Sequence, residues 1–336
     1  MFLTHTNSIY SEEITLIDHV PYPQYGHQIS DGGLPVRKGI KTMPAALVHY
    51  VLSGQHGAMD GTSKFIRALT STNKHKVGFI LASGGTTWTG YEASTVRTDR
   101  YPVHQVVPMG LTQVYAGSIA NKIGDFDYIV TDSSSCISGH SAWYTASMLM
   151  QVGRLDAVVI ISVDNGLSEE YMDVFSSHKL SKALDEEYDS SVQKFRLGQG
   201  CNISVFESEN CATDTNHAPI AKIIDMHIAA ESYSSPLGIS PEGSGYCKVI
   251  NNVNTSNISF IKTHSTFSCD NAIEAELINS RFGDIRTINY KLRIGHTMGA
   301  STAIETALAI TEESGTFLSL GAGMGNAYSS AVVEIC

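Results

Sequence analysis

One order of elements occurs twice in this chain, and it limits the fold more than any other feature of the sequence. In residues 128–163 a short apolar segment, a small-residue loop with Cys136, a helical pattern and a second apolar segment follow one another. A similar order follows the loop that contains His296. Because alternating strands and helices are typical of layered α/β proteins, the recurrence predicts two similar α/β halves.

Apolar patterns predict where the strands and helices lie. Residues 157–163 (Ala-Val-Val-Ile-Ile-Ser-Val) are almost wholly apolar, which is typical of a parallel strand buried on both faces. The helical pattern at 142–152 stops before Gly153, a residue suited to end a helix. Further strands are expected at 77–82, 128–130, 201–206, 316–320 and 331–335, and further helices at 111–123 and after His296.

Length, composition and charge limit the protein class. The 336 residues can bury a large core, and 42% hydrophobic with 16% charged residues is ordinary for a globular protein. The net charge of −11 makes nucleic acid or an anionic membrane a poor default partner. We expect no membrane insertion, since no apolar run is long enough to span a bilayer. We expect no secretory signal, since residues 1–7 show no basic segment followed by an apolar one. Six scattered cysteines without a Cys-x-x-Cys pair favour reduced thiols in the cytoplasm.

A change of composition suggests the domain organisation. Residues 166–194 are more polar than their surroundings and include an acidic run at 185–187. We expect an N-terminal half at 1–165, a connecting excursion at 166–194 and a C-terminal half at 195–336.

Three residues carry the candidate chemistry. Cys136 is expected at the start of a helix. There the positive end of the helix dipole stabilises a thiolate and lowers the pKa of the thiol. His264 lies in a loop rich in hydroxyl groups, and His296 lies between Gly295 and Gly299, where a ligand can approach closely. Taken alone, each of the three residues also fits a buried structural role. The spacing therefore leaves both a catalytic and a structural role open.

Several segments, in order, resemble the β-ketoacyl-carrier-protein synthases of the thiolase superfamily, of the elongating type with a Cys-His-His triad. The similarity extends over most of the chain from about residue 77. The segments are 132–139 (Asp-Ser-Ser-Ser-Cys-Ile-Ser-Gly), 153–159 (Gly-Arg-Leu-Asp-Ala-Val-Val), 195–200 (Phe-Arg-Leu-Gly-Gln-Gly), 264–268 (His-Ser-Thr-Phe-Ser), 291–300 (Lys-Leu-Arg-Ile-Gly-His-Thr-Met-Gly-Ala) and 321–326 (Gly-Ala-Gly-Met-Gly-Asn).

The resemblance implies a five-layer αβαβα fold of two duplicated halves with mixed sheets, and a buried nucleophile helix. It implies that Cys136 accepts an acyl group from a carrier-protein thioester. His264 and His296 would bind the malonyl thioester and assist decarboxylation, and Lys291 would orient His264.

The same resemblance implies the supporting residues and partners. No metal or redox cofactor is expected, because phosphopantetheine arrives as part of the substrate. Expected partners are an acyl carrier protein and a second subunit, in a homodimer or in a heterodimer with a ketosynthase-like chain. The implied residues are Asp270, Glu274 and Glu305 near Lys291; Gly321, Ala322 and Gly323 in the closing turn, with the backbone N–H groups of Cys136 and Ala322 as the oxyanion hole; Thr266 and Ser268 on the pantetheine; and Arg37, Lys38 and Lys41 at the carrier-protein docking site.

Departures from the family pattern keep alternatives open. Ala322 stands where elongating relatives often have a gating phenylalanine, and Gln199 replaces the usual glutamate. These changes favour a specialised fatty-acid or polyketide pathway. A non-elongating acyltransferase that passes the acyl group to an amine or hydroxyl is one alternative, and a subunit that sets chain length is another. A zinc site is not favoured, because Cys269, His264 and His296 are not closely spaced.

Overall fold

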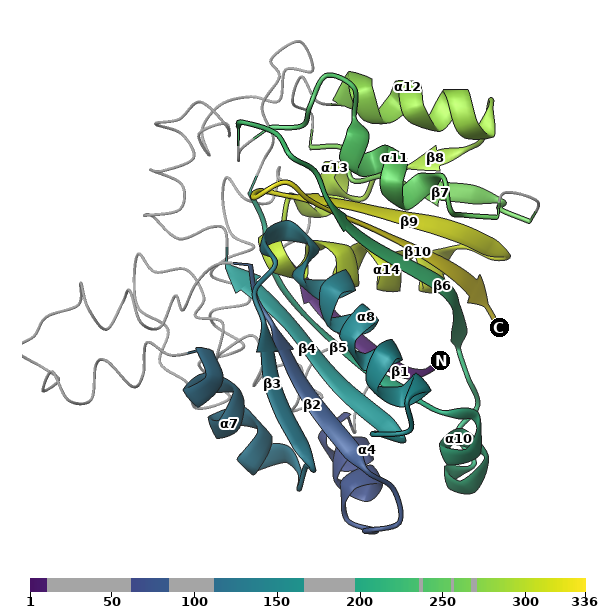
Figure 1. The fold of residues 1–336 in the computed structure, drawn as a ribbon. Coiled ribbons are helices and arrows are strands. Elements are labelled where there is room, and N and C mark those ends of the chain that lie inside the picture. Colours follow the sequence, from purple (N-terminus) through teal and green to yellow (C-terminus); the bar gives the residue numbers. More distant parts are fainter. Residues whose placement is uncertain (11–61, 85–111, 166–196, 236–237, 255–256, 267–270) are drawn as a thin grey trace, which may run out of the picture.

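The computed structural model describes residues 1–10, 62–84, 112–165, 197–235, 238–254, 257–266 and 271–336. Ten strands form one hydrogen-bonded sheet in the order β3-β2-β4-β5-β1-β6-β10-β9-β7-β8 (Figure 1). The strands are β1 (Phe2–Tyr10), β2 (Val77–Ala82), β3 (Tyr128–Asp132), β4 (Ala157–Asn165), β5 (Gln199–Glu207), β6 (Ala221–Ala230), β7 (Phe260–Lys262), β8 (Thr287–Ile288), β9 (Thr316–Gly323) and β10 (Ala327–Ile335).

The strand order repeats, and this repeat divides the sheet into two halves. Strands β1 to β5 are ordered 3-2-4-5-1, and β6 to β10 are ordered 8-7-9-10-6, the same arrangement shifted by five. Strand directions match as well: β2 is parallel to β3 and β4 as β7 is to β8 and β9, while β5 and β10 each run antiparallel to their neighbours. A short β1–β6 pairing, Phe2 opposite Lys222 and Leu3 opposite Ala221, joins the halves. The predicted duplication with mixed sheets is therefore confirmed.

Three hydrophobic cores show that the molecule has five layers. The first half is covered on one face by α4 (Thr62–Thr70) and α7 (Thr112–Ile123), which share a core with β2, β4 and β5. The second half is covered by α11 (Ser244–Ile250) and α12 (Asn271–Phe282), which share a core with β7, β9 and β10. Between the halves, α8 (Ser138–Gln151) and α14 (Ser301–Glu312) contribute to a third core with strands of both (Figure 1). The remaining described α-helices are α10 (Glu209–Thr215) and α13 (Lys291–Ile294).

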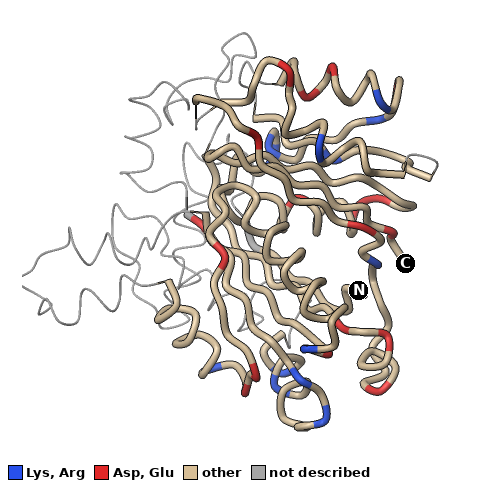
Figure 2. The backbone as a smooth tube through the Cα atoms, viewed as in Figure 1, with Lys and Arg blue, Asp and Glu red and all other residues tan. Residues whose placement is uncertain are grey.

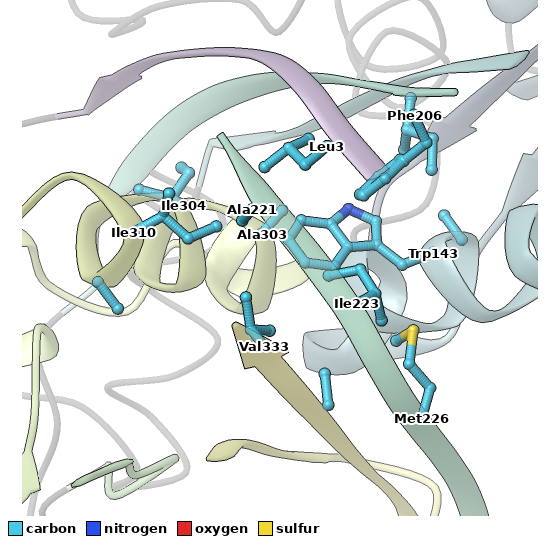
Figure 3. Close-up of a cluster of buried hydrophobic side chains, with 14 of the residues drawn as sticks. Leu3, Trp143, Phe206, Ala221, Ile223, Met226, Ala303, Ile304, Ile310 and Val333 are labelled. Carbon is cyan, nitrogen blue, oxygen red and sulfur yellow. The ribbon is translucent and has the colours of Figure 1, made fainter. Parts of the chain in front are cut away.

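Trp143 of α8 lies at the centre of the middle layer. Its indole is fully buried and meets the Phe206 ring edge-on, with the ring centroids 5.0 Å apart. Figure 3 shows this ring between Phe206 and Leu3 of the first half and Ala221, Ile223 and Ala303 of the second. The middle core therefore holds the two halves together, and it fixes the helix that follows Cys136.

The composition of α8 explains why this helix is central. It contains no Lys, Arg, Asp or Glu, and Figure 2 shows it without a charged residue along its length. It ends just before Gly153, whose φ of +67° is in the left-handed region that favours glycine, as predicted. The helices of the described part are all too short or too polar to cross a membrane.

The expected strands and helices lie within one to several residues of the observed ones. In its hydrogen bonding, β5 belongs with the strands that precede residue 166. It pairs with β1 and β4, so the repeat of the sheet changes halves between β5 and β6. After residue 196 the chain returns and pairs antiparallel with β4. Composition does not reveal such a pairing between segments that are distant in the sequence. The excursion at 166–194 lies outside the described residues, and the three-part domain division stays a prediction.

Candidate active site

A tight turn presents Cys136 between β3 and α8. It lies in a 3₁₀ turn, η1 (Ser135–Ile137), and is 3% exposed. The first residue of the turn, Ser135, has a φ of +55°, an uncommon conformation for a residue other than glycine. Ser138 stabilises the turn, because its hydroxyl donates to the Ser135 carbonyl at 2.6 Å and accepts from the Ser134 N–H at 2.9 Å.

The second half has an equivalent turn before α14. In η2 (Met298–Ala300) the first residue, Met298, has a φ of +51°, so Gly299 takes the position that Cys136 has in the first half. The two turns meet at Gly84. The buried Asp164 carboxylate joins the segments, since one oxygen accepts from the N–H groups of Gly84 (2.8 Å) and Gly299 (2.7 Å).

The structure brings Cys136 and both predicted histidines together. His296 Nε2 lies 3.1 Å from Cys136 Sγ. The His264 and His296 rings are nearly perpendicular, at 85°, with centroids 5.6 Å apart. All three side chains are buried. This is the spacing at which one small reacting group can contact a sulfur atom and two imidazoles together.

The loop of His264 is held through its backbone. The Glu274 carboxylate accepts from the N–H of His264 and from that of Ser265, both at 2.7 Å. Lys291 Nζ donates to the His264 carbonyl at 2.6 Å. Lys291 thus contacts His264 at its main chain, and its charge also lowers the pKa of the His264 ring.

Glu305 of α14 is the centre of a buried charged cluster. Its two carboxylate oxygens contact Lys291 Nζ at 2.7 Å and Lys262 Nζ at 3.2 Å, respectively. Lys262 also donates to the carbonyl of Leu320, at 2.6 Å, which connects β7 to the strand before the closing turn. The Ser301 hydroxyl donates to Glu305 and contacts His296 Nδ1 at 3.1 Å.

Burial makes the neutral forms of the reacting groups the stable ones. It lowers the pKa of His296 to about 3 and that of His264 well below its usual value, with Lys291 adding to both shifts. Burial also raises the pKa of the Cys136 thiol, although the hydrogen bond from Ser135 and the charge of Lys291 act the other way. The expected lowered pKa of Cys136 is therefore wrong, because loss of solvation on burial is the largest effect on this thiol.

The closing turn packs against the backbone of Cys136. Residues 321–323 are the end of β9, and a Cβ atom at Gly323 would be 3.2 Å from the Cys136 nitrogen. Ala322 is buried in the same strand. A backbone hydrogen bond from Met324 reaches the Cys136 sulfur and favours its thiolate form. The turn therefore supplies main-chain donors close to the reacting atom.

Of the remaining predicted residues, the structure describes Thr266 but not the other five. Thr266 is half-buried, and its N–H donates to the Asn271 side chain at 3.0 Å. Ser268, Asp270, Arg37, Lys38 and Lys41 lie outside the described residues. Within the described residues, no group of three His, Cys, Asp or Glu side chains is arranged to hold a metal ion.

Sequence reasoning missed four residues of this site, and each had a weak signal. Lys262 is a single cation in an otherwise apolar strand, and Ser301 precedes Glu305 by one helical turn. Asp164 lies near the end of a mostly apolar strand, and Met324 lies in the closing turn. Only the folded chain shows that these residues contact Cys136, His296 or the groups that hold them.

Comparisons with solved structures identify the fold. No protein-family model matches the chain. A chain of a type II polyketide synthase assembly, an acyl-carrier protein in complex with its ketosynthase bound to the hexaketide, matches with a TM-score of 0.74, 16% identity and coverage of 100% of this chain and 98% of that one. A chain of the complex of a ketosynthase with its chain length factor from Xenorhabdus doucetiae matches with a TM-score of 0.71, 15% identity and the same coverage.

The chain therefore has the thiolase-like fold of these ketosynthase structures.

Two curated proteins are similar to this chain in sequence. Nodulation protein E of Rhizobium sp. (strain N33) is 24% identical over 252 residues, which are 69% of this chain and 61% of that protein. A 3-oxoacyl-[acyl-carrier-protein] synthase homolog of Saccharomyces cerevisiae is 22% identical over 222 residues, 61% of this chain and 50% of that protein. The similarity thus spans about half to three fifths of the length of these relatives.

Proposed function

We propose that the protein is a ketosynthase that joins a Cys136-bound acyl group to a malonyl unit on a carrier protein, with loss of carbon dioxide. The contact between Cys136 Sγ and His296 Nε2 at 3.1 Å, with His264 adjoining, carries this proposal. Similarity to a nodulation protein E and to a 3-oxoacyl synthase homolog supports it.

The first step transfers the acyl group to the cysteine. The thiol loses its proton to His296, the sulfur attacks the thioester carbonyl, and the carrier's pantetheine thiol leaves with that proton. Main-chain N–H groups of Cys136 and of the closing turn at Ala322 stabilise the charge on the carbonyl oxygen. A neutral imidazole is ready for this role because it has a free nitrogen lone pair.

The second step forms the carbon–carbon bond. The malonyl thioester binds beside His264 and His296, its carboxylate leaves as carbon dioxide, and the resulting enolate attacks the acyl carbonyl on Cys136. The cysteine leaves as a thiolate and takes up a proton from water, so the products are a 3-ketoacyl thioester on the carrier and the free Cys136 thiol. An imidazole donor to the malonyl carbonyl stabilises the enolate without first having to bind a proton.

The same proposal includes the partners. An acyl carrier protein delivers both substrates, and the protein acts as a homodimer or with a ketosynthase-like subunit. Two similar structures come from assemblies of these kinds, a ketosynthase with its acyl-carrier protein and a ketosynthase with its chain length factor. No metal or redox cofactor takes part.

Incubation with medium-chain acyl carrier protein and malonyl carrier protein tests the function, with intact mass of the carrier as the readout. A carrier-bound product longer by one ketide unit, lost in Cys136→Ala, is expected. Acylation of Cys136 without extension, also after addition of a candidate partner subunit, would overturn condensation in favour of acyl transfer to an amine or hydroxyl.

A further inference from the structure

A continuous row of hydrogen-bonded groups leads from Cys136 to Glu305. Cys136 Sγ contacts His296 Nε2 at 3.1 Å, and His296 Nδ1 contacts Ser301 Oγ at 3.1 Å. The Ser301 hydroxyl in turn donates to Glu305 Oε1. Ser301 and Glu305 are fully buried and His296 nearly so, so these protein groups, rather than bulk water, decide where each proton lies.

The two lysines decide the protonation state at the far end of the row. Lys291 and Lys262 lie on the two oxygens of Glu305, at 2.7 Å and 3.2 Å. Burial alone would raise the pKa of Glu305, but the two cations together lower it. Glu305 is therefore a carboxylate, which accepts hydrogen bonds and donates none.

The direction of each remaining hydrogen bond follows from this. A serine hydroxyl has one proton, and Ser301 gives it to the Glu305 carboxylate. The Ser301 oxygen can then only accept from His296, so Nδ1 of that ring carries the N–H. A neutral imidazole has one N–H, and Nε2 therefore presents a lone pair to the Cys136 thiol.

We propose that Ser301 is a positioning residue that holds His296 in the Nδ1–H tautomer, with Glu305 and its two lysines as the anchor, so that His296 is the proton acceptor for Cys136. The inference rests on the proposed function for its step, in which the Cys136 proton moves to His296 Nε2 and then to the leaving pantetheine thiol. Ser301 and Glu305 lose and gain no proton during that step.

The proposal separates the tasks of the two histidines. No described residue provides a hydrogen-bond partner for Nδ1 of His264, although this atom is buried. Within the described part of the chain, no side chain holds the tautomer of His264 as Ser301 holds that of His296. His264 can present an N–H to the thioester carbonyl, while His296 in the resting state accepts from the thiol.

Histidine side-chain ¹⁵N NMR on the intact protein tests the tautomer directly. His296→Asn identifies which signals belong to His296. We expect the wild-type His296 ring to have a protonated Nδ1 and an unprotonated Nε2 at pH 7. In Ser301→Ala we expect a shift toward the Nε2–H form, whereas Ser301→Thr keeps the hydroxyl and the Nδ1–H form.

Ser330→Ala is a matched control, since this buried hydroxyl donates to the Val249 carbonyl at 2.8 Å, away from His296. It should leave the His296 signals unchanged. A wild-type His296 that is protonated at Nε2, or a Ser301→Ala protein with an unchanged tautomer, would overturn the proposal. The wild-type spectrum decides the first point even if a variant fails to fold.

Single-turnover acylation of Cys136 by an acyl thioester gives a second readout. Ser301→Ala should acylate at least about tenfold more slowly at saturating thioester, because a misplaced proton removes the general base. Ser301→Thr and Ser330→Ala should acylate at rates near wild type. The two hypotheses can fail separately. Normal acylation without condensation would refute the ketosynthase function alone. A His296 ring protonated at Nε2 would refute the role of Ser301 alone.

Discussion

At the scale of single residues, burial keeps the Cys136 thiol and the His296 imidazole in their neutral forms. Burial disfavours both the thiolate of Cys136 and the imidazolium of His296, and the two atoms are 3.1 Å apart. A proton can therefore move between them only when a thioester arrives to accept the developing charge on sulfur. This limits side reactions of the thiol before the substrate binds.

Substitution of the nucleophile and of His264 should separate the two steps. Cys136→Ala is expected to abolish acylation and condensation. His264→Ala is expected to keep acylation within about tenfold and to lower condensation by a hundredfold or more, since an enolate donor is lost. Intact mass of the protein and of the carrier measures the two steps. Normal condensation by His264→Ala would contradict the mechanism.

The protonation state of Cys136 should appear in its pH-dependent alkylation. Since burial raises its pKa above the ordinary 9.0, we expect the midpoint of iodoacetamide labelling at Cys136 to lie above pH 9. Peptide mapping by mass spectrometry follows this one thiol, with a free cysteine peptide as the reference. A midpoint near pH 7 would mean that the helix dipole and Lys291 outweigh burial.

At the scale of elements, the two 3₁₀ turns are built as a pair. Both η1 and η2 start with a residue at positive φ, and both lead into a helix of the middle layer. The first turn carries the nucleophile, whereas the second has Gly299 at the equivalent place and meets Gly84 there. The close approach of the backbones brings the His296 loop to Cys136.

Two glycine substitutions test this close approach. A Cβ atom at Gly299 would lie 1.9 Å from the Gly84 nitrogen, so Gly299→Ala should lower the free energy of unfolding by about 3 kcal/mol. At Gly117 in α7 a Cβ atom meets nothing within 4 Å, and Gly117→Ala should raise it by about 0.5–1 kcal/mol. Urea unfolding measures both. Equal effects would show that the turns are not in tight contact.

At the scale of the whole molecule, the middle layer combines apolar contacts with buried titratable groups. Trp143 and its neighbours provide the apolar part. His140 is fully buried in the same layer and contacts the hydroxyls of Ser329, Thr306 and Ser319, at 2.9, 3.2 and 3.1 Å. The folded protein therefore keeps several histidines neutral that would bind protons in the unfolded chain.

Acid should destabilise the fold for this reason. Burial lowers the pKa of His140, His264 and His296 below 6.5, so between about pH 6.5 and 5 the unfolded chain binds more protons and stability falls as pH falls. Each contributes up to about 1.4 kcal/mol per pH unit. Burial raises the pKa values of Asp132 and Glu274, which oppose the trend at lower pH.

Urea unfolding at several pH values measures this dependence. His140→Asn, which removes one of the three histidines, should give a shallower slope between pH 6.5 and 5 than the wild type. A wild-type free energy of unfolding that stays constant over this range would contradict buried neutral histidines.

The sequence by itself determined the local elements and singled out the candidate site residues. Periodicity reports which face of a segment is buried, so the apolar run at 157–163, the helix ending at Gly153 and the order of the repeat were all visible. Cys136, His264, His296 and Lys291 were found because they lie in short motifs.

Only the tertiary structure decided how these groups are charged and which of their neighbours matter. Ser301, Lys262 and Asp164 come from different strands and helices, and no local pattern predicts their contacts with His296, Glu305 and Gly299, respectively. The direction of the pKa shift of Cys136 also depended on the fold, because burial removes the thiol from solvent. Solvation and hydrogen-bond direction are set by atoms far apart in the chain, which become neighbours only when the two halves close around the site.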